Sequence, residues 1–422
     1  MTKFAQKLSA QAFCAMSRLL TLVLFLTLFG VSTVLAQTRA YVTNIIDNTV
    51  SVIDSTTNTV IATVPVGQNP ITVAVTPNGA FAYVANQGSH TVSVIDAATN
   101  SVIATVGVQS TPWAIAMAPS GAFVYVANQN SNTISVISTA TNTVTATISV
   151  GVQPIGVAVT PNGAFIYVGN SAGNTVSVID ATTNTVSATI TGLSSPANLA
   201  ITPNGAFAYV TNRGNNTVSV IDTATNTITA TIPVGVSPTF LDTTPDGAFV
   251  YVSNFFSDSV SVIDTATNTV IALVHVPNLP TGVAVNPDGT LVYVGSINGA
   301  AVFLIDTATN TVTASIPVGN GPTGIAFPTR APAPVDPIDS LIAQVRALVA
   351  GGSLTQSQGD ALIGKLHEIR TKIDNGQTNA ACNQLSSFIN QVNGFINNGS
   401  LTTSQGQALI NSANAIKSTL GC

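Results

Sequence analysis

This chain of 422 residues is poor in charge. Asp, Glu, Lys and Arg together make up 6% of it, against roughly 25% in an average soluble domain. Residues 41 to 328 contain no Glu, Lys or Cys, and their eleven Asp against the single Arg213 give a formal charge of −10. A region with so few basic groups does not attract nucleic acid or an anionic membrane, and we expect neither as a partner. Its solubility must depend on Thr, Asn and Ser.

Groups that support catalysis are also few. The same region holds two histidines, His90 and His275, and the chain has no pair of cysteines followed by His of the kind that attaches a c-type haem. A histidine-rich metal site or a His-activated nucleophile needs several such groups close together. The sequence therefore predicts no metal, no cofactor and no enzymatic activity.

Long apolar runs are lacking except near the N-terminus. Basic residues there precede an apolar run over residues 19–35, which ends in Val34-Leu35-Ala36. This order is typical of a secretory signal peptide, which we predict over residues 1–36. An uncleaved membrane anchor is the alternative, because the run is long enough to span a bilayer. We expect no membrane span after signal removal and an extracytoplasmic protein, either secreted, periplasmic or on the cell surface.

One sequence repeat makes up most of the chain. A Tyr-Val pair returns every 42 residues without an insertion or deletion, at Tyr41, Tyr83, Tyr125, Tyr167, Tyr209, Tyr251 and Tyr293. A period in the forties, built from short β-type runs, is typical of one blade of a β-propeller.

Each period holds four runs that are rich in Val, Ile, Thr, Tyr or Phe and separated by turn residues. In one copy these runs are residues 197–202, 206–212, 217–222 and 227–234, and their composition predicts strands. We therefore predict an all-β, seven-bladed propeller with four-stranded blades over residues 37–330.

The phase of the repeat predicts how the ring closes. The first Tyr-Val pair has no inner strand before it, whereas an extra strand at Pro322 to Phe327 follows the last copy. Pairing of this strand with the one at Tyr41 completes the first blade and removes an open sheet edge.

Acidic and amide side chains recur at the turns. Asp96, Asp180 and their equivalents end strands, and Pro-Asn-Gly or Pro-Asp-Gly recurs between the first two strands of most blades. Metal binding or catalysis is one interpretation of the carboxylates. Capping of tight turns is the other, and we favour it. The glycine of the second motif predicts a positive φ.

The motif Pro280-Thr281-Gly282-Val283-Ala284-Val285-Asn286-Pro287-Asp288-Gly289, followed by Tyr293-Val294 and by Val302 to Asp306, resembles the YVTN family of β-propeller repeat proteins. The resemblance covers about residues 38–328. It implies a propeller in an extracytoplasmic setting, because similar repeats occur in surface-layer proteins of archaea and in many secreted bacterial proteins. Members of the family share no single activity, so the resemblance implies no function.

Two sets of loops vary from copy to copy, and both open at the end of the ring where the innermost strand begins. A pocket at the mouth of the central channel is one hypothesis, with aromatic walls for a sugar or peptide. Ordinary drift on a tolerant surface is the alternative, with the bulkiest residues filling space between blades. The candidate binding residues, all departures from the repeat, are Trp113, Arg213, Phe240, Asp242, Phe255, Phe256 and His275.

These features predict a non-catalytic propeller that binds a protein or glycan at the cell envelope. A structural component of a surface layer is one alternative, favoured by the low charge and the high Thr and Asn content. A propeller enzyme of the lactonase or lyase type is another. Such enzymes have a similar architecture, but their acidic, His or Arg constellations have no residue-by-residue match here.

After a Pro-rich linker over residues 331–337, the apolar period becomes helical, and we predict a small four-helix domain over residues 338–422. The domain is internally duplicated, because Gly352 to Gly359 recurs 47 residues later as Gly399 to Gly406. Each copy contains a Thr-x-x-Gln capping box that predicts a helix start.

Cys382 and Cys422 are the only cysteines outside the predicted signal peptide. An oxidising compartment favours a disulfide between them, whereas a metal or redox pair is the less favoured alternative. The segments Phe388 to Val392 and Gly406 to Leu409 are similar to C-terminal modules of the FIMAH type found on bacterial cell surfaces. That resemblance implies surface attachment or contact with a partner.

Overall fold

The computed structural model describes residues 39–328, 337–350, 352–374 and 377–422. The predicted signal peptide lies outside these residues, as does the predicted linker except for Pro337. The chain divides into two compact units, Met1–Ala331 and Pro332–Cys422, and each is described by itself.

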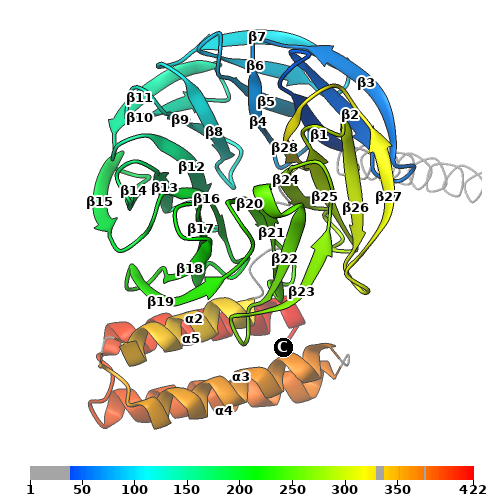
Figure 1. Cartoon of the computed structure of the whole chain (residues 1–422). Helices are drawn as coiled ribbons and strands as arrows, with labels where there is room; N and C mark the ends of the chain where they lie inside the picture. The colour runs from blue at the N-terminus through cyan, green and yellow to red at the C-terminus, as the bar shows by residue number, and fades with distance from the viewer. Residues whose placement is uncertain (1–38, 329–336, 351, 375–376) are drawn as a thin grey trace, which may run out of the picture. The chain divides into compact units, whose positions relative to one another are not determined.

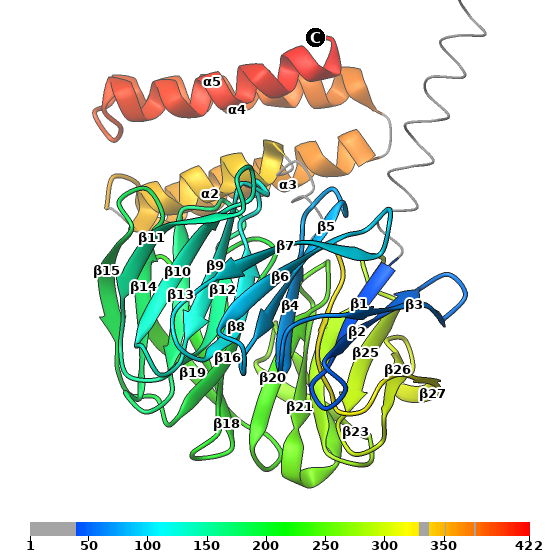
Figure 2. The same ribbon diagram turned by 90° about the horizontal axis from the view of Figure 1, so that it is seen from above.

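The first unit is a ring of seven four-stranded antiparallel sheets (Figure 1). This confirms the predicted seven-bladed propeller. The blades are seen from the side in Figure 2.

Four strands build each blade from the axis of the ring outward. The innermost strands are β4 (Pro70–Val75), β8 (Pro112–Met117), β12 (Pro154–Val159), β16 (Pro196–Ile201), β20 (Pro238–Thr243), β24 (Pro280–Val285) and β28 (Pro322–Ala326). The second strands are β1 (Arg39–Asn44), β5 (Phe81–Asn86), β9 (Phe123–Asn128), β13 (Phe165–Asn170), β17 (Phe207–Asn212), β21 (Phe249–Asn254) and β25 (Leu291–Ser296).

The third strands are β2 (Thr49–Asp54), β6 (Thr91–Asp96), β10 (Thr133–Ser138), β14 (Thr175–Asp180), β18 (Thr217–Asp222), β22 (Ser259–Asp264) and β26 (Ala301–Asp306). The outer strands are β3 (Thr59–Pro65), β7 (Ser101–Gly107), β11 (Thr143–Ser149), β15 (Thr185–Ile190), β19 (Thr227–Pro233), β23 (Thr269–His275) and β27 (Thr311–Pro317).

The C-terminal strand closes the ring as predicted. β28 pairs with β1 in antiparallel register, with Tyr41 opposite Ala326 and Val42 opposite Ile325. The first blade is therefore built from both ends of the propeller sequence. The Phe327 ring then packs edge-on against Tyr293 of the last blade, with ring centroids 5.0 Å apart.

Burial explains why the repeat keeps its Tyr-Val-x-Asn pattern. Neighbouring blades cover both faces of a sheet, so the middle strands bury nearly every residue instead of alternate ones; β5, for example, buries all but its first residue. The buried Asn86 ends this strand, and its Nδ2 donates to Ser93 Oγ at 2.9 Å. The same bond recurs in five other blades, and it satisfies a polar group that is expensive to bury alone. It is formed by Asn44, Asn128, Asn170, Asn212 and Asn254.

Five of the seven repeated tyrosines fasten their blade to the next one. The Tyr83 hydroxyl, for example, donates to Asn142 Oδ1 at 2.8 Å, and burial raises the pKa of this tyrosine to about 12. Equivalent bonds join four further pairs, Tyr167 to Asn226, Tyr209 to Asn268, Tyr251 to Asn310 and Tyr293 to Asn58.

The turns bear out the capping interpretation of the carboxylates. Asp96 Oδ1 accepts the backbone N–H groups of Ala98 and Thr99 at 2.9 Å, and the bonds from Thr99 and Ala98 lower the pKa of Asp96. In the turn after β4, Gly79 has a φ of 68°, as predicted for the glycine of the Pro-Asn-Gly motif.

The second unit is all-helical, as predicted, with α2 (Pro337–Ala350), α3 (Gln356–Asp374), α4 (Thr378–Asn397) and α5 (Thr403–Leu420). A Thr402–Gln405 capping box starts α5, and Thr355 and Gln358 exchange the same two bonds before α3. No helix among the described residues is long and apolar enough to cross a membrane.

The predicted disulfide is also present. Cys382 of α4 is bonded to Cys422, with Cα atoms 5.9 Å apart. The bridge fixes the end of the chain beyond α5 to the preceding helix.

Candidate functional site

The variable end of the ring is formed by loops that brace one another. In five loops an Asn or Asp with positive φ turns the chain after the second strand, and its side chain accepts an N–H from the loop that leads to the next inner strand. His90 forms the equivalent bond in the second blade, where its Nδ1 accepts the Thr111 N–H at 3.0 Å. The departure of His90 from the repeat is thus a structural replacement for asparagine.

Phe255 and Phe256 are the most conspicuous departures at this end. They begin a short 3₁₀ helix, Phe255–Ser257, and their rings pack edge to face with centroids 4.9 Å apart. The Phe256 side chain is 66% exposed. Both backbone N–H groups donate to the neighbouring loop, at Ser237 and Val236. The pair is therefore held in place before any partner binds.

Arg213 follows β17 at the same end, and its N–H donates to the carbonyl of Ser195, just before β16. Its guanidinium forms no ion pair with any side chain in the part of the chain that the structure describes. Burial by the surrounding protein lowers the pKa of Arg213. The residue as a whole is nevertheless exposed at the surface, so this cation is accessible to an anionic group on a ligand.

Trp113 and Phe240 are half-buried and lie in different parts of the ring. Trp113 packs into the hydrophobic cluster between the third and fourth blades, whereas Phe240 packs into the cluster between the sixth and seventh. They do not face each other as two walls of one pocket. Their packing is what the space-filling alternative expects.

Asp242 lies near the far end of β20, the fifth of six residues from the variable end. Its Oδ1 accepts the N–H of Thr243 and its Oδ2 accepts the N–H of Val285 in β24, both at 2.8 Å. The carboxylate thus bridges the innermost strands of two blades. Burial raises its pKa to about 6, although the two N–H groups oppose the shift.

His275 ends the outer strand β23 and is exposed. Asp242 is on the innermost strand of the same blade, so two strands lie between them, and strand spacing alone places their backbones more than about 14 Å apart. The structure brings Phe255 and Phe256 together, but it does not assemble His275, Asp242 and Arg213 into one catalytic group. Among the described residues, no group of three or more His, Cys, Asp or Glu side chains is placed to hold a metal.

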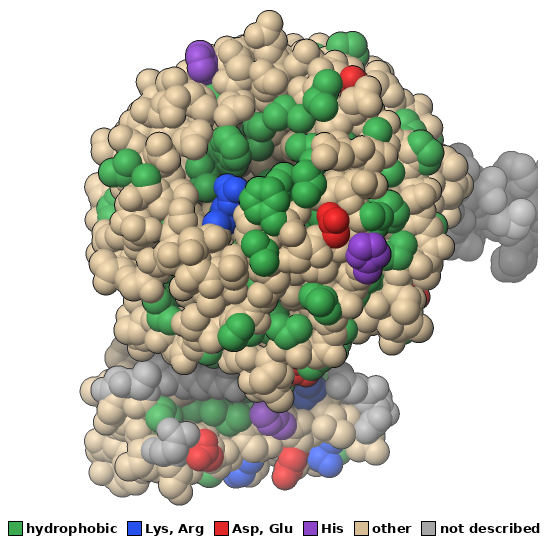
Figure 3. Space-filling model, in the orientation of Figure 1, with side chains coloured by type: hydrophobic (Ala, Val, Ile, Leu, Met, Phe, Trp, Pro, Cys, Tyr) green, Lys and Arg blue, Asp and Glu red, His purple; other side chains and the backbone are tan. Residues whose placement is uncertain are grey.

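Figure 3 shows the surface of the ring viewed along its axis. Hydrophobic side chains gather around a central hollow, and charged side chains are sparse on this face. The surface is mostly polar and uncharged, as the composition predicts.

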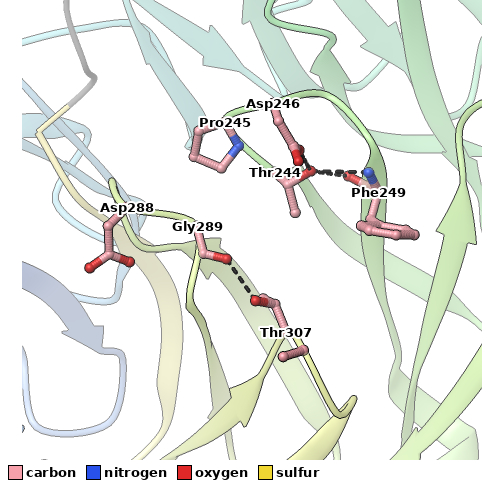
Figure 4. Close-up of a pocket in the computed structure, with 8 residues that line it drawn as sticks. Thr244, Pro245, Asp246, Phe249, Asp288, Gly289 and Thr307 are labelled. Carbon is pink, nitrogen blue, oxygen red and sulfur yellow. Dashed lines mark hydrogen bonds between the residues drawn. The ribbon is translucent and has the colours of Figure 1, made fainter.

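A pocket of about 370 Å³ lies at the opposite end of the ring, between the sixth and seventh blades. Its polar lining includes Asp246, Asp288 and Thr307, and Phe249 supplies an aromatic wall (Figure 4). Asp246 accepts the Ala248 N–H, and Asp288 accepts the Thr290 N–H. The two carboxylates therefore cap their own turns. None of the predicted binding residues lines this pocket. The sequence signal that could have indicated it is the Pro-Asp-Gly motif in place of Pro-Asn-Gly in these two blades.

Comparison with known proteins agrees with this architecture. Three family models match. A lactonase-type seven-bladed β-propeller matches residues 180–285, a YNCE-like β-propeller residues 108–215, and a FIMAH domain residues 338–418. The predicted FIMAH resemblance is confirmed, while the YVTN resemblance stays a prediction. A comparison with curated proteins gave no match.

Several solved structures contain a similar ring. The hydrazine synthase of Kuenenia stuttgartiensis is 25% identical, with a TM-score of 0.55 over 60% of this chain and 88% of that one. A functionally unknown protein from Desulfotomaculum acetoxidans is 18% identical, with a TM-score of 0.63 over 68% of this chain and 98% of that one. The dihydro-heme d1 dehydrogenase NirN is 14% identical, with a TM-score of 0.56 over 71% and 77%. These likenesses show the propeller fold.

Proposed function

We propose that the ring is a non-catalytic binding module, secreted or displayed at the cell surface, whose variable end contacts a protein or glycan of the cell envelope. The observation that carries the proposal is the Phe255–Phe256 pair. A large exposed aromatic side chain on a preformed loop loses little conformational entropy on binding, and such residues commonly anchor interfaces.

Other exposed apolar residues in loops of the variable end also support a binding site there. Val236, on the loop that accepts the Phe256 N–H, is itself 48% exposed. Ile46 and Val152 are also exposed in loops of this end. An apolar surface rimmed by polar loops is typical of an interaction site. The predicted signal peptide and the disulfide, a bond favoured in an oxidising compartment, support a location outside the cytoplasm.

The test is binding of the full chain to an array of bacterial envelope glycans and to purified envelope proteins. We expect the double substitution Phe255→Ser and Phe256→Ser to reduce binding at least ~10-fold, as loss of a hot spot does. Phe207→Ser is the matched control, because Phe207 is an exposed phenylalanine that follows the Pro-Asn-Gly turn at the opposite end. Equal binding by the double variant and the native chain would show that the assignment to this end is wrong.

A lactone hydrolase is the second candidate, and the lactonase-type match over residues 180–285 favours it. That segment includes Arg213, Asp242 and His275. Turnover of sugar or aliphatic lactones by the full chain, if abolished by Asp242→Asn or Arg213→Gln, would replace the non-catalytic proposal. Turnover unaffected by either substitution would point to a contaminating activity.

A further inference from the structure

The pocket between the sixth and seventh blades lies at two turns that depart from the repeat in the same way. In these blades the middle residue of the Pro-x-Gly turn is acidic, Asp246 and Asp288. It is uncharged in the four other blades that have this turn, at Asn78, Ser120, Asn162 and Asn204. The sixth and seventh blades are therefore the only neighbours in which both turns of this kind are acidic, and the cavity of about 370 Å³ lies between them.

The two acidic turns are in contact. A Cβ atom on Gly289 would lie 3.2 Å from Cδ of Pro245, and these two residues directly adjoin Asp288 and Asp246 in the chain. Figure 4 shows both aspartates on these neighbouring turns, with the Phe249 ring on the side of Asp246. Two carboxylates thus border one cavity, an arrangement that a positive charge between them stabilises.

Each carboxylate has one oxygen that the turn does not use. Asp246 Oδ1 accepts the Thr244 hydroxyl and the Ala248 N–H. Asp288 Oδ1 accepts the N–H and the hydroxyl of Thr290. Within the described structure no other residue donates to either Oδ2 atom, and both aspartates are exposed. The bonds from Thr244 and Ala248 lower the pKa of Asp246, so this group is ionised at neutral pH.

A third carboxylate adds to the negative field at this pocket. Asp306 caps the turn that supplies Thr307 to the lining, because its Oδ1 accepts the Thr309 N–H at 2.8 Å. Burial, and then the charges of Asp306 and Asp246, raise the pKa of Tyr251 to about 12. The two carboxylates therefore act on the same neighbouring hydroxyl. A field of this sign repels anions and favours a cationic ligand.

The rest of the lining is suited to an organic cation. The described part of the chain places no three His, Cys, Asp or Glu side chains together around a metal ion. Phe249, Pro245 and Ala308 give the pocket an apolar wall, and Thr244 and Thr307 are its uncharged polar residues. The volume of about 370 Å³ falls in the range of small-molecule sites, roughly 300 to 1,000 Å³.

We propose that this pocket binds a protonated amine carried on a compact, partly apolar skeleton. The ammonium group lies between Asp246 and Asp288, and the skeleton packs against the Phe249 ring, so that charge-assisted hydrogen bonds and aromatic contact act on the same ligand. An amino sugar and the side chain of a lysine both present this chemistry, and the test distinguishes them. The pocket is at the opposite end of the ring from the proposed binding surface, and the inference does not depend on that proposal.

Calorimetric titration of the full chain tests the ligand class. The two probes are glucosamine and the amide of Nα-acetyl-lysine, and we expect saturable binding of at least one of them. Glucose and the amide of Nα-acetyl-norleucine are the matched neutral ligands, which should bind at least ~5-fold more weakly because they lack the ammonium group. Binding of one amine alone identifies the skeleton that the pocket accepts. Binding of neither amine, or equal binding of an amine and its neutral match, overturns the inference.

Substitution of both aspartates by asparagine then tests the site. Asp246→Asn with Asp288→Asn removes the two charges and should preserve the turns, because Asn162 at the equivalent position accepts the Ala164 N–H at 3.0 Å, as Asp246 accepts that of Ala248. We expect this variant to keep the circular dichroism of the native chain and to raise the amine dissociation constant at least ~5-fold.

The matched control is Asp180→Asn with Asp222→Asn. It removes the same charge from turns of the fourth and fifth blades at the same end of the ring, away from the pocket, and salt screening should limit its effect to less than ~2-fold. Equal weakening by the two double variants would show a general field instead of a site and overturns the inference. Amine binding that survives Asp246→Asn with Asp288→Asn overturns it as well. So does Ca²⁺ binding that this variant loses while neither amine binds, because the pocket would then be a metal site.

Discussion

The Tyr293 hydroxyl donates a hydrogen bond to Asn58 Oδ1, although 235 residues of chain separate the two. Tyr293 belongs to the last blade and Asn58 to the first, so this bond joins the ends of the ring. It acts beside the pairing of β28 with β1. The closure is therefore made twice, once near the axis by backbone pairing and once farther out by side chains.

Loss of this bond should weaken the ring measurably. We expect Tyr293→Phe to lower the free energy of unfolding by ~1 to 2 kcal/mol, because it removes one hydrogen bond and leaves the partly buried Asn58 oxygen without a donor. Tyr125→Phe is the matched control. Its expected partner, Asn184, has an Oδ1 that accepts no hydrogen bond in the described structure, so this change should be close to neutral. Urea unfolding of both variants measures the difference, and equal losses would contradict the role given to the closing pair.

Asp242 should make stability depend on pH in the opposite sense from the turn carboxylates. Burial raises its pKa from the usual 3.8 to about 6, so the folded state holds this proton more tightly than the unfolded state does. Stability from this group is then lost as pH rises from about 4 through 6, and the shift corresponds to ~3 kcal/mol.

Asp242→Ala tests this directly, because all six equivalent inner-strand positions are alanine. We expect the stability of the variant relative to the native chain to improve by ~3 kcal/mol between about pH 3.5 and pH 7.5. Asp96→Asn should show the reverse trend, since hydrogen bonds lower the pKa of Asp96. Unfolding midpoints across the pH series measure both, and parallel profiles for native and Asp242→Ala proteins would falsify the assignment.

Close approach of the inner strands should make Gly156 intolerant of substitution. A Cβ atom at this position would lie 2.0 Å from the carbonyl oxygen of Ala197 in the next blade. We expect Gly156→Ala to cost at least ~2 to 3 kcal/mol or to prevent folding, because backbone has to move. Gly107→Ala, on an outer edge with no atom within 4 Å of the new methyl group, should be neutral in the same thermal melts.

The disulfide should stabilise mainly the helical unit against unfolding. Cys382 and Cys422 close a loop with a sequence separation of 40, for which loop entropy predicts ~3 to 4 kcal/mol. We expect Cys382→Ser with Cys422→Ser to lower the melting temperature of the helical signal in circular dichroism while the β signal of the ring melts unchanged. Reducing agent should reproduce the loss in the native chain and leave the double variant unaffected.

The repeat made most of the fold predictable before any coordinates. The strand at Pro322 was assigned to the first blade from phase alone, and the four strands of the copy at 197–234 end within one residue of their observed bounds. These features follow from local turn chemistry and from burial on both faces, which the sequence pattern records directly. The helix starts at Thr355 and Thr402 could likewise be predicted, because each capping box is a local sequence pattern.

The arrangement of the candidate residues was not predictable in this way. Position in the repeat shows which strand holds Asp242, but not that its carboxylate turns toward Val285 in the next blade. His90 and Asp258 depart from the asparagine found at this position in other blades, yet both accept the same loop N–H that asparagine accepts elsewhere. Gly156 and Ala114 occupy equivalent positions, and only the distance to the adjacent strand shows why the fourth blade excludes a methyl group where the third holds one. Such contacts depend on neighbouring blades, whose residues are far apart in the sequence.

The shared first blade also sets an order of events during synthesis. β1 is made early, but its inner neighbour, β28, is among the last strands of the ring to emerge, and Thr43 and Thr323, which bond across this seam, are 280 residues apart. Until then β1 presents an unpaired strand edge, the kind of edge that recruits foreign strands. The ring thus stays vulnerable to misassembly until the nascent chain is nearly complete, and any truncation before residue 322 would leave that edge open permanently.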